Sequence, residues 1–280
     1  MSCPKAIAAT RELRQVIQVE LEKSGIAILP PMEVARTTSL MEALEMPIDT
    51  SMLDPWYNKG FGGIQADYHD YFLSIIRRAG TFSQHVFFWG FPEIIAPFVE
   101  RIPEPLELTS WLTWYYKNNP SVIRGWRSSQ NACLHMSIAG AKLYPERFLN
   151  DKQLELKGKG KLRYMPGPTS VIATTPDDVI EESLLVGFIG KKEQTGHPSQ
   201  KPQKVYDQLL RMSVADAGIV WDPMSGSGTT GAVCRDRGFR AILCDGSDEF
   251  TALSEKRLGA KRLEVSGLIE AILDQERASA

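Results

Sequence analysis

A glycine-rich segment near the C-terminal end of the sequence has the composition of a ligand-binding turn. Between a predicted strand at 219–221 and a predicted helix at 229–237 it reads Asp222-Pro223-Met224-Ser225-Gly226-Ser227-Gly228-Thr229-Thr230. Glycines let a backbone approach a ligand closely, and the first turn of a helix offers free N–H groups. The G-K-[ST] ending of a P-loop is missing, whereas G-x-G-x-x-G is matched through Gly231. Taken alone, this match is equally typical of an ordinary tight turn.

Two acidic residues narrow the chemistry of the ligand. Asp245 follows Asp222 by 245 − 222 = 23 residues and comes directly after the next predicted strand, at 241–244. A carboxylate in that place can accept hydrogen bonds from both hydroxyls of a ribose. Asp222 suits a ligand that carries an amino group near its sugar, so the pattern favours an adenosine-containing ligand.

The elements that must position these residues alternate along the chain. Strands are predicted at 48–53, 86–89, 106–116, 132–139, 219–221 and 241–244, and helices at 9–23, 64–76, 205–212, 229–237 and 248–262. Such alternation predicts an α/β fold with a mostly parallel central sheet flanked by helices and an antiparallel hairpin at its edge. The amphipathic helix at 9–23 is expected to pack on the core or on a second subunit, because acidic residues interrupt its polar face.

Composition excludes several other classes of protein. The 280 residues include 32 basic and 34 acidic side chains, so the net charge of −2 requires any nucleic-acid surface to be local. The four cysteines stand singly, which indicates neither a disulfide framework nor a zinc site and fits a reducing cytosol. Since no run of about 18 apolar residues is present and the first ten residues lack a signal-peptide core, we expect a cytoplasmic protein without a membrane partner.

Three motifs together resemble those of the S-adenosylmethionine-dependent amino DNA methyltransferases, which modify cytosine N4 or adenine N6. The turn at 222–230 is similar to their cofactor motif D-P-F-x-G-S-G-T-T, residues 197–202 match H-P-x-Q-K-P, and residues 54–57 resemble the catalytic D-P-P-Y. With the catalytic motif first, the order corresponds to the family's beta arrangement and brackets residues 54 to about 258. The resemblance implies a Rossmann-like methyltransferase fold that uses S-adenosylmethionine and no metal.

The resemblance also implies a role for each residue of the catalytic motif, which is Asp54, Pro55, Trp56 and Tyr57. Asp54 and the carbonyl of Pro55 would accept hydrogen bonds from the target amine, and Tyr57 would stack on a base flipped out of the duplex. Trp56 stands where the family has a second proline. That departure puts the pocket shape and the activity in doubt, although the backbone carbonyl is supplied by any residue.

The resemblance also implies which residues bind the cofactor. Asp222 and the turn would lie near the methionine end, Asp245 near the ribose, and the H-P-x-Q-K-P residues would close the site. Lys201 could instead cap a helix or hold a phosphate, and His197 could be a hydrogen-bonded turn residue. The expected cofactor-binding residues are Asp222, Pro223, Met224, Ser225, Gly226, Ser227, Gly228, Thr229, Asp245, His197, Gln200 and Lys201.

Two basic clusters are candidates for DNA contact. The first contains Lys157, Lys159, Lys161 and Arg163, and the second contains Arg124 and Arg127 on either side of Gly125-Trp126. Both suit salt-sensitive phosphate contacts, and either is equally a solvated loop when taken alone. The first cluster lies between the catalytic and cofactor motifs, where the family keeps its recognition segment, and this favours DNA.

These observations predict four segments and one leading function. The segments are an N-terminal helical extension (1–35), a catalytic half (36–143), a loop-rich DNA target-recognition insert (144–196) and a cofactor-binding half (197–280). The expected function is site-specific methylation of double-stranded DNA, at adenine N6 rather than cytosine N4 because the catalytic motif begins with Asp. The alternatives are a catalytically silent DNA-binding partner with the same fold, and an RNA or small-molecule methyltransferase. A homodimer and a companion restriction endonuclease stay open as further partners in restriction–modification.

Overall fold

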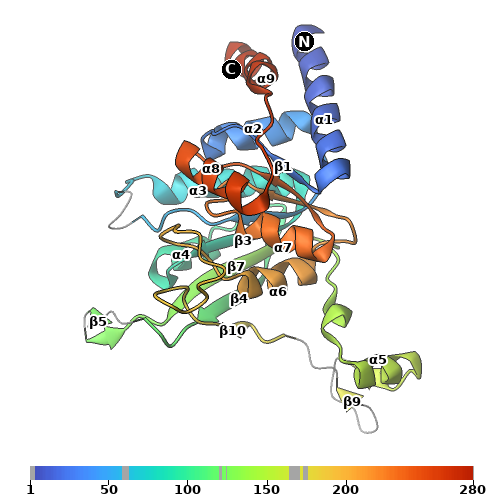
Figure 1. The fold of residues 1–280 in the computed structure, drawn as a ribbon, viewed down its shortest axis with the longest axis vertical. Coiled ribbons are helices and arrows are strands. Elements are labelled where there is room, and N and C mark those ends of the chain that lie inside the picture. Colours follow the sequence, from blue (N-terminus) through green and yellow to red (C-terminus); the bar gives the residue numbers. More distant parts are fainter. Residues whose placement is uncertain are drawn as a thin grey trace.

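An eight-stranded sheet forms the centre of the structure (Figure 1). The computed structural model describes residues 4–58, 63–119, 122–123, 125–163, 171–172 and 176–279. The strands are β1 (Ile26–Ile28), β2 (Ile48–Leu53), β3 (Ser83–Gly90), β4 (Leu106–Tyr115), β5 (Val122–Ile123), β6 (Trp126–Arg127), β7 (Gln130–Ile138), β8 (Leu162–Arg163), β9 (Val171–Ile172), β10 (Val179–Glu181), β11 (Ile219–Asp222) and β12 (Arg240–Leu243). The helices are α1 (Pro4–Ser24), α2 (Val34–Leu44), α3 (Tyr68–Phe82), α4 (Pro92–Val99), α5 (Asp151–Gly158), α6 (Gln203–Ser213), α7 (Thr229–Arg237), α8 (Asp248–Leu258) and α9 (Ser266–Ser279), with a 3-10 turn η1 (Pro145–Phe148).

The order of the strands confirms the predicted fold class. The sheet runs β1-β12-β11-β2-β3-β7-β4-β10, and all neighbouring strands are parallel except that β7 is antiparallel to both β3 and β4. The predicted hairpin is β4–β7. The three-residue strand β10 continues the sheet beyond this hairpin, and it comes from the segment expected to be an insert.

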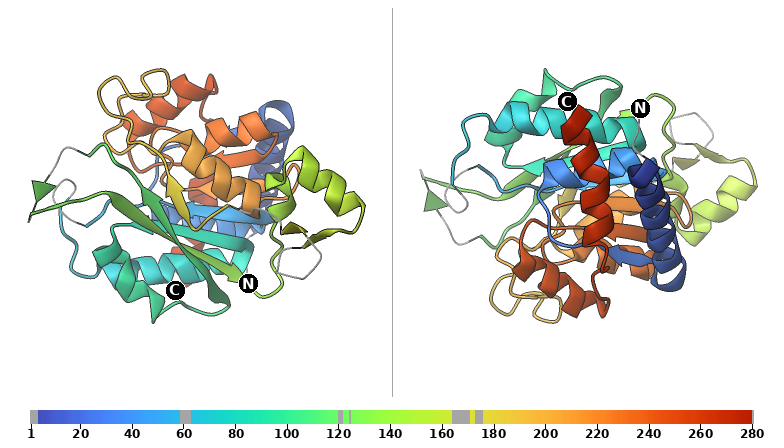
Figure 2. Two further views of the ribbon diagram at one scale, coloured as in Figure 1. Left: turned by 90° about the horizontal axis from the view of Figure 1, so that it is seen from below. Right: turned by 90° about the horizontal axis from the view of Figure 1, so that it is seen from above.

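Helices cover both faces of the sheet (Figure 2). Trp221 and Val220 are consecutive residues of β11 that pack into separate apolar clusters, because successive side chains of a strand point to opposite faces. Phe72 of α3 belongs to the cluster of Trp221, whereas Leu209 of α6 and Val233 of α7 belong to the other. A parallel sheet buried in this way places its loops, and hence its site, at the strand ends.

The N-terminal segment contributes a strand as well as the predicted helix. The buried face of α1 carries Leu13, Ile17 and Leu21, and the helix packs against the C-terminal helix α9 (Figure 1). Beyond Gly25, β1 pairs with β12 and forms one border of the sheet. The expected helical extension therefore passes directly into the sheet.

The segment that follows β7 leaves the sheet at the edge where the parallel strands begin, since β7 runs in the opposite direction. Hydrogen bonds to the C-terminal end of α6 and the residues after it hold this segment at that edge. The N–H of Tyr144 donates to the carbonyl of Met212 (2.9 Å), and Arg147 donates to the carbonyl of Val214 and to Asp216 (2.5 and 2.7 Å). Residues 145–163, which include α5, project from this edge (Figure 1).

Two histidines form a buried pair between β3 and β7. Nδ1 of His85 lies 3.1 Å from Nε2 of His135, and Nε2 of His85 lies 3.1 Å from the carbonyl of Lys142. A carbonyl only accepts, so Nε2 of His85 carries a proton and its Nδ1 accepts from His135. Burial, together with His85, lowers the pKa of His135 to about 3, and burial also lowers the pKa of His85. Both imidazoles are therefore neutral near pH 7.

This pair makes the fold sensitive to acid. Because the unfolded chain binds protons at the ordinary histidine pKa of 6.5 and the folded pair binds them only at lower pH, stability is lost as the pH falls below about 6.5. At pH 4.5, His135 alone is expected to cost about 2 to 3 kcal/mol. Urea unfolding of His135→Gln, which keeps a polar partner for His85, should depend less on pH between 7 and 4.5. His69→Gln leaves the pair intact and should keep the wild-type slope; equal slopes in all three proteins would contradict this account.

Candidate active site

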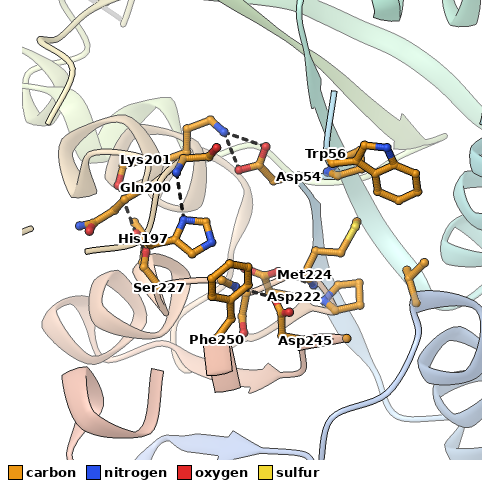
Figure 3. Close-up of a pocket in the computed structure, with 18 of the residues that line it drawn as sticks. Asp54, Trp56, His197, Gln200, Lys201, Asp222, Met224, Ser227, Asp245 and Phe250 are labelled. Carbon is orange, nitrogen blue, oxygen red and sulfur yellow. Dashed lines mark hydrogen bonds and ion pairs between the residues drawn. The ribbon is translucent and has the colours of Figure 1, made fainter. Parts of the chain in front are cut away.

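A pocket of about 510 Å³ opens at the carboxyl ends of β2, β11 and β12. Its position follows from the parallel strands, whose ends meet at one edge and present their following loops together. Figure 3 shows the side chains that line it. The lining residues are Glu33, Val34, Asp54, Pro55, Trp56, Tyr57, His197, Pro198, Ser199, Gln200, Lys201, Tyr206, Asp222, Pro223, Met224, Ser225, Gly226, Ser227, Thr229, Asp245, Gly246 and Phe250.

Asp54 and Lys201 form a buried ion pair on one wall of the pocket. Nζ of Lys201 lies 2.7 and 2.6 Å from the two carboxylate oxygens of Asp54, and the side chains are only 3% and 16% exposed for Lys201 and Asp54. Burial by itself would lower the pKa of Lys201, but the charge of Asp54 raises it above the ordinary value. Tyr206 adds a hydrogen bond to Asp54 at 3.2 Å. The carboxylate is thus fixed in orientation and faces the pocket.

The same ammonium group holds Tyr57. Nζ of Lys201 lies 2.7 Å from the Tyr57 hydroxyl, and the amide of Asn131 donates to that hydroxyl at 3.2 Å. Burial raises the pKa of Tyr57 to about 12, although Lys201 opposes this shift. Its ring packs edge-on against Phe91, with 4.6 Å between centroids. Tyr57 is therefore a neutral phenol whose ring cannot swing freely.

The indole of Trp56 packs against side chains of α3. Its ring makes edge contacts with Tyr68 and Phe72 at 5.6 and 5.8 Å, and its carbonyl accepts a hydrogen bond from Tyr68 (3.0 Å). In Figure 3 its indole is directed away from Lys201. The residue that departs from the expected proline thus leaves Asp54 and Tyr57 in place.

The glycine-rich turn joins β11 to α7 and is fixed by its neighbours. Gly226 has a φ of +48°, and a Cβ there would lie 2.9 Å from Nε2 of His197, so a side chain would push the His197 ring from the wall. A Cβ at Gly231 would lie 2.7 Å from Leu258 and 2.8 Å from Leu243, so this third glycine allows helix and sheet to pack closely. Arg257 of α8 donates to Ser227 and Thr229.

Two buried carboxylates lie on the cofactor side of the pocket. Asp222 accepts from the N–H of Met224 (3.1 Å) and from the hydroxyl of Thr230, and burial nevertheless raises its pKa to about 7. Asp245 accepts from the N–H of Gly226 (2.8 Å) and of Ser247 (2.9 Å), and burial raises its pKa as well. None of the ion pairs among the described residues involves either carboxylate. A cationic ligand would relieve the cost of burying them.

The H-P-x-Q-K-P segment closes the pocket, and the side chains of His197, Gln200 and Lys201 make different contacts there. The ring of His197 packs on Phe250 at 4.3 Å, and burial lowers its pKa, so it forms a neutral wall. Gln200 is engaged within its own loop, where it accepts from Thr195 and donates to the carbonyl of Glu193 (2.8 Å). The side chain of Lys201 lies with the catalytic motif, and only its carbonyl contacts the cofactor turn, through Thr229.

The structure brings the predicted catalytic and cofactor residues into one pocket, with Gly228 as the exception. Gly228 precedes α7 with a φ of +72° and does not line the pocket. The lining residues that sequence reasoning missed are Glu33, Val34, Pro198, Ser199, Tyr206, Gly246 and Phe250. Two of these residues could have been predicted from the sequence. Tyr206 follows the H-P-x-Q-K-P motif and lies in the first turn of α6, and Phe250 follows the predicted strand at 241–244 and lies in the first turn of α8. Glu33 gave no signal, because its place depends on the pairing of Met32 with Asp245 (3.0 Å).

The predicted DNA-binding residues lie away from the pocket. Lys157, Lys159, Lys161 and Arg163 belong to the α5 projection at the opposite edge of the sheet (Figure 2), and Lys159 is paired with Glu155. Arg127 is exposed in β6, in the hairpin tip beyond the carboxyl end of β4, and Arg124 lies outside the described residues. No described residue of the predicted insert, 144–196, lines the pocket, but its end contacts the pocket wall, because Gln200 donates to the carbonyl of Glu193 at 2.8 Å.

The structure gives no sign of a metal centre or a membrane span within its described ranges. No group of three potential metal-ligating His, Cys, Asp or Glu side chains occurs there. In the same ranges, the helices are too short or too polar to cross a membrane.

An α/β sheet that ends in a pocket with a G-x-G-x-x-G turn, two buried acids and a D-P-W-Y motif defines a methyltransferase-like protein. Residues 48–256 match the N6_N4_Mtase family, described as DNA methylase, and the chain belongs to this family.

Curated relatives agree with the family. Type II methyltransferase M.HpaI of Haemophilus parainfluenzae is 28% identical over 153 residues, which cover 54% of this chain and 45% of that protein. Type II methyltransferase M2.DpnII of Streptococcus pneumoniae is 37% identical over 65 residues, 23% of this chain and 24% of that protein. The matched part of the chain thus spans less than half the length of these relatives.

Solved structures agree on the fold. The M1.HpyAVI–SAM complex superposes with a TM-score of 0.58 at 17% identity, over 83% of this chain and 98% of that one. The cytosine-N4-specific PvuII DNA methyltransferase gives a TM-score of 0.56 at 15% identity, over 91% and 95% of the two chains. The Rossmann-like methyltransferase fold predicted from the sequence is confirmed.

Proposed function

We propose that this chain transfers a methyl group from S-adenosylmethionine to an exocyclic amine of double-stranded DNA, with adenine N6 preferred over cytosine N4. The observation that carries the proposal is the shared pocket, in which Asp54 faces the cofactor turn and its two acids. Membership of the DNA methylase family supports it. The names of the relatives, Type II methyltransferases, support restriction–modification as the setting, with a companion endonuclease as a partner.

The residues present fit S-adenosylmethionine. A pocket of about 510 Å³ is of the usual size for a small-molecule site. The buried carboxylates of Asp222 and Asp245 would meet the ammonium group and the ribose hydroxyls, and the glycine turn lets the backbone approach them. When bound, S-adenosylmethionine supplies an electrophilic methyl group on a sulfonium.

The catalytic motif would orient the amine. Lys201 donates to both oxygens of Asp54 and Tyr206 to one of them, and the carboxylate together with the carbonyl of Pro55 would accept the two amine protons. This would direct the nitrogen lone pair to the methyl group that S-adenosylmethionine supplies; the transfer would form a C–N bond in place of the C–S bond, and the nitrogen would release one proton to water. Lys201 holds the carboxylate of Asp54 in place, so catalysis here consists of orientation and electrostatics.

Two observations bear on the alternatives. Trp56 motivated a catalytically silent partner, but its packing on α3 leaves Asp54 and Tyr57 facing the pocket, which favours an active enzyme. The target-recognition role expected for 144–196 stays a prediction, and the position of α5 and its lysines at the other edge of the sheet favours the later part of this segment for it. A homodimer and a cytoplasmic location stay predictions from the sequence.

Labelled S-adenosylmethionine tests the proposal. The wild-type chain should transfer label to mixed duplex DNA, whereas Asp54→Ala and Asp54→Asn should lose about 100-fold or more of the rate and still bind the cofactor in calorimetry. Asp67→Asn, an exposed acid before α3, is the matched control and should keep the wild-type rate. Equal incorporation by the Asp54 variants would refute the role of Asp54. Mass spectrometry of the digested DNA should show N6-methyladenine, and N4-methylcytosine alone would overturn the preference for adenine.

A further inference from the structure

Three large apolar side chains stand almost entirely in solvent at the edge of the sheet that holds the pocket. Ile64, Trp126 and Phe188 are 79%, 85% and 87% exposed, more than any other large apolar side chain in the described ranges. Each lies on a segment that leaves a carboxyl strand end: Ile64 after β2, Trp126 between β4 and β7, and Phe188 after β10. Exposed apolar residues at the edge of the sheet that holds the pocket indicate a contact surface.

Trp126 is carried by the most projecting of these segments (Figure 1). The β4–β7 ladder runs to Tyr115 and Gln130, and beyond it the N–H of Tyr116 donates to the carbonyl of Ser129 at 2.8 Å. The two arms meet again in β5–β6, where Trp126 pairs with Ile123. The ladder therefore continues as an arm that extends past the catalytic edge.

The root of this arm touches the catalytic motif. Asn131, the second residue of β7, donates to the hydroxyl of Tyr57 at 3.2 Å. From Asn131 to Trp126 the chain has five steps, and a strand advances about 3.3 Å per residue, so the Cα atoms of these two residues are at most about 17 Å apart. That distance lies within the span of a few base-pair steps of a duplex seated over the pocket.

The basic residues near Trp126 and Phe188 indicate which kind of molecule would bind this surface. Arg127 is exposed beside Trp126, and Lys191 and Lys192 are exposed just after Phe188. Two acids of the neighbouring segment are already paired with lysines, Glu181 with Lys117 (2.6 Å) and Glu182 with Lys204 (2.7 Å). Exposed rings interleaved with unneutralised cations suit a polyanion with stackable bases, which is a nucleic acid.

We propose that Trp126 inserts into the base stack of the duplex and fills the gap left when the target base enters the pocket. This inference rests on the proposed function, since only a flipped base leaves such a gap. Flipping costs the stacking of the base on its neighbours, and an indole that occupies the vacancy recovers part of it. Arg127 would contact the adjacent phosphate and hold the tip of the hairpin at the backbone.

The test compares two duplexes that contain the target sequence found by modified-base sequencing. In one the target base is paired; in the other it faces an abasic site, so it flips at little cost. Trp126→Ala should lower the single-turnover methylation rate about tenfold or more on the paired duplex and less than about threefold on the abasic one. Trp126→Phe, which keeps an aromatic ring, should stay within about threefold of wild type on both. With 2-aminopurine at the target position, the fluorescence increase on binding should be lost in Trp126→Ala.

Phe188→Ala is the matched control, because this side chain has the same exposure on another segment at this edge of the sheet. It should change both rates by the same factor. A wild-type rate in Trp126→Ala on the paired duplex, or an equal loss on the two duplexes, would overturn the insertion while leaving the proposed function intact. A wild-type chain that methylates neither duplex would refute the proposed function itself, and the insertion with it.

Discussion

Replacing Lys201 by methionine should destabilise the protein and abolish most of its turnover. The ammonium group is almost fully buried and contacts both oxygens of Asp54 and the hydroxyl of Tyr57. Removing one partner of a buried ion pair leaves an uncompensated charge, which costs about 3 to 5 kcal/mol in fully buried cases. Since Asp54 opens to the pocket, we expect the lower end, about 3 kcal/mol, in urea unfolding.

The double variant Lys201→Met with Asp54→Asn separates the two effects. It leaves no charge buried in the wall, so its unfolding free energy should return to within about 1 kcal/mol of wild type. Its methyl-transfer rate should stay as low as that of the single variants, because the acceptor for the amine is gone. The affinity of Lys201→Met for S-adenosylmethionine should change little, since Asp222 and Asp245 are untouched. A single variant as stable and active as wild type would contradict the structural role of the pair.

Asp222→Asn should have opposite effects on stability and on cofactor binding. Burial raises the pKa of Asp222 from an ordinary 3.8 to about 7. The folded chain therefore keeps a proton that the unfolded chain has released, and stability falls as the pH rises from about 4 to 7. Above pH 7 the ionised carboxylate costs up to about 4 kcal/mol. The amide avoids this cost and can still accept from Met224 and donate to Thr230.

The expected result at pH 8 is a gain in unfolding free energy of about 1 to 3 kcal/mol for Asp222→Asn, which disappears near pH 4. The affinity for S-adenosylmethionine should fall about tenfold or more, because a neutral amide cannot balance the charge of the ammonium group. Asp67→Asn, at an exposed position, should alter neither quantity. Thermal unfolding over pH, combined with titration calorimetry, checks both. An Asp222→Asn protein less stable than wild type at pH 8 would contradict the account.

The motifs predicted the residues of the pocket, but the chemistry inside it depends on contacts between residues that are far apart in the sequence. Asp54 and Lys201 are 147 residues apart, and each motif alone gives no reason to place the lysine on the catalytic carboxylate. Only the three-dimensional order of β2 and the start of α6 brings them together. The strands β1 and β10 were missed for a local reason: with three residues each, they are too short to show a period.

The position of the lysine cluster could have been inferred from the predicted hairpin. If the strand at 132–139 runs against its neighbours, the chain that follows it must leave at the edge where the parallel strands begin. The chain that carries the cluster from Lys157 to Arg163 therefore starts at the edge opposite to the residues that follow β2 and β11, and the cluster is found on that side. Motif order places a recognition segment along the sequence, whereas strand direction decides on which side of the sheet it lies.

The order of the strands also has a consequence for how the chain folds. β1 and β2 are the first strands to be made, yet they are separated in the sheet by β12 and β11, which come last. Until about residue 243 is available, neither early strand has its neighbour on that side, and α1 lacks α9. Contacts of such long sequence separation slow folding, because a large loop must close before they form. We therefore expect the sheet to form from its middle and to be completed only once β11 and β12 are available.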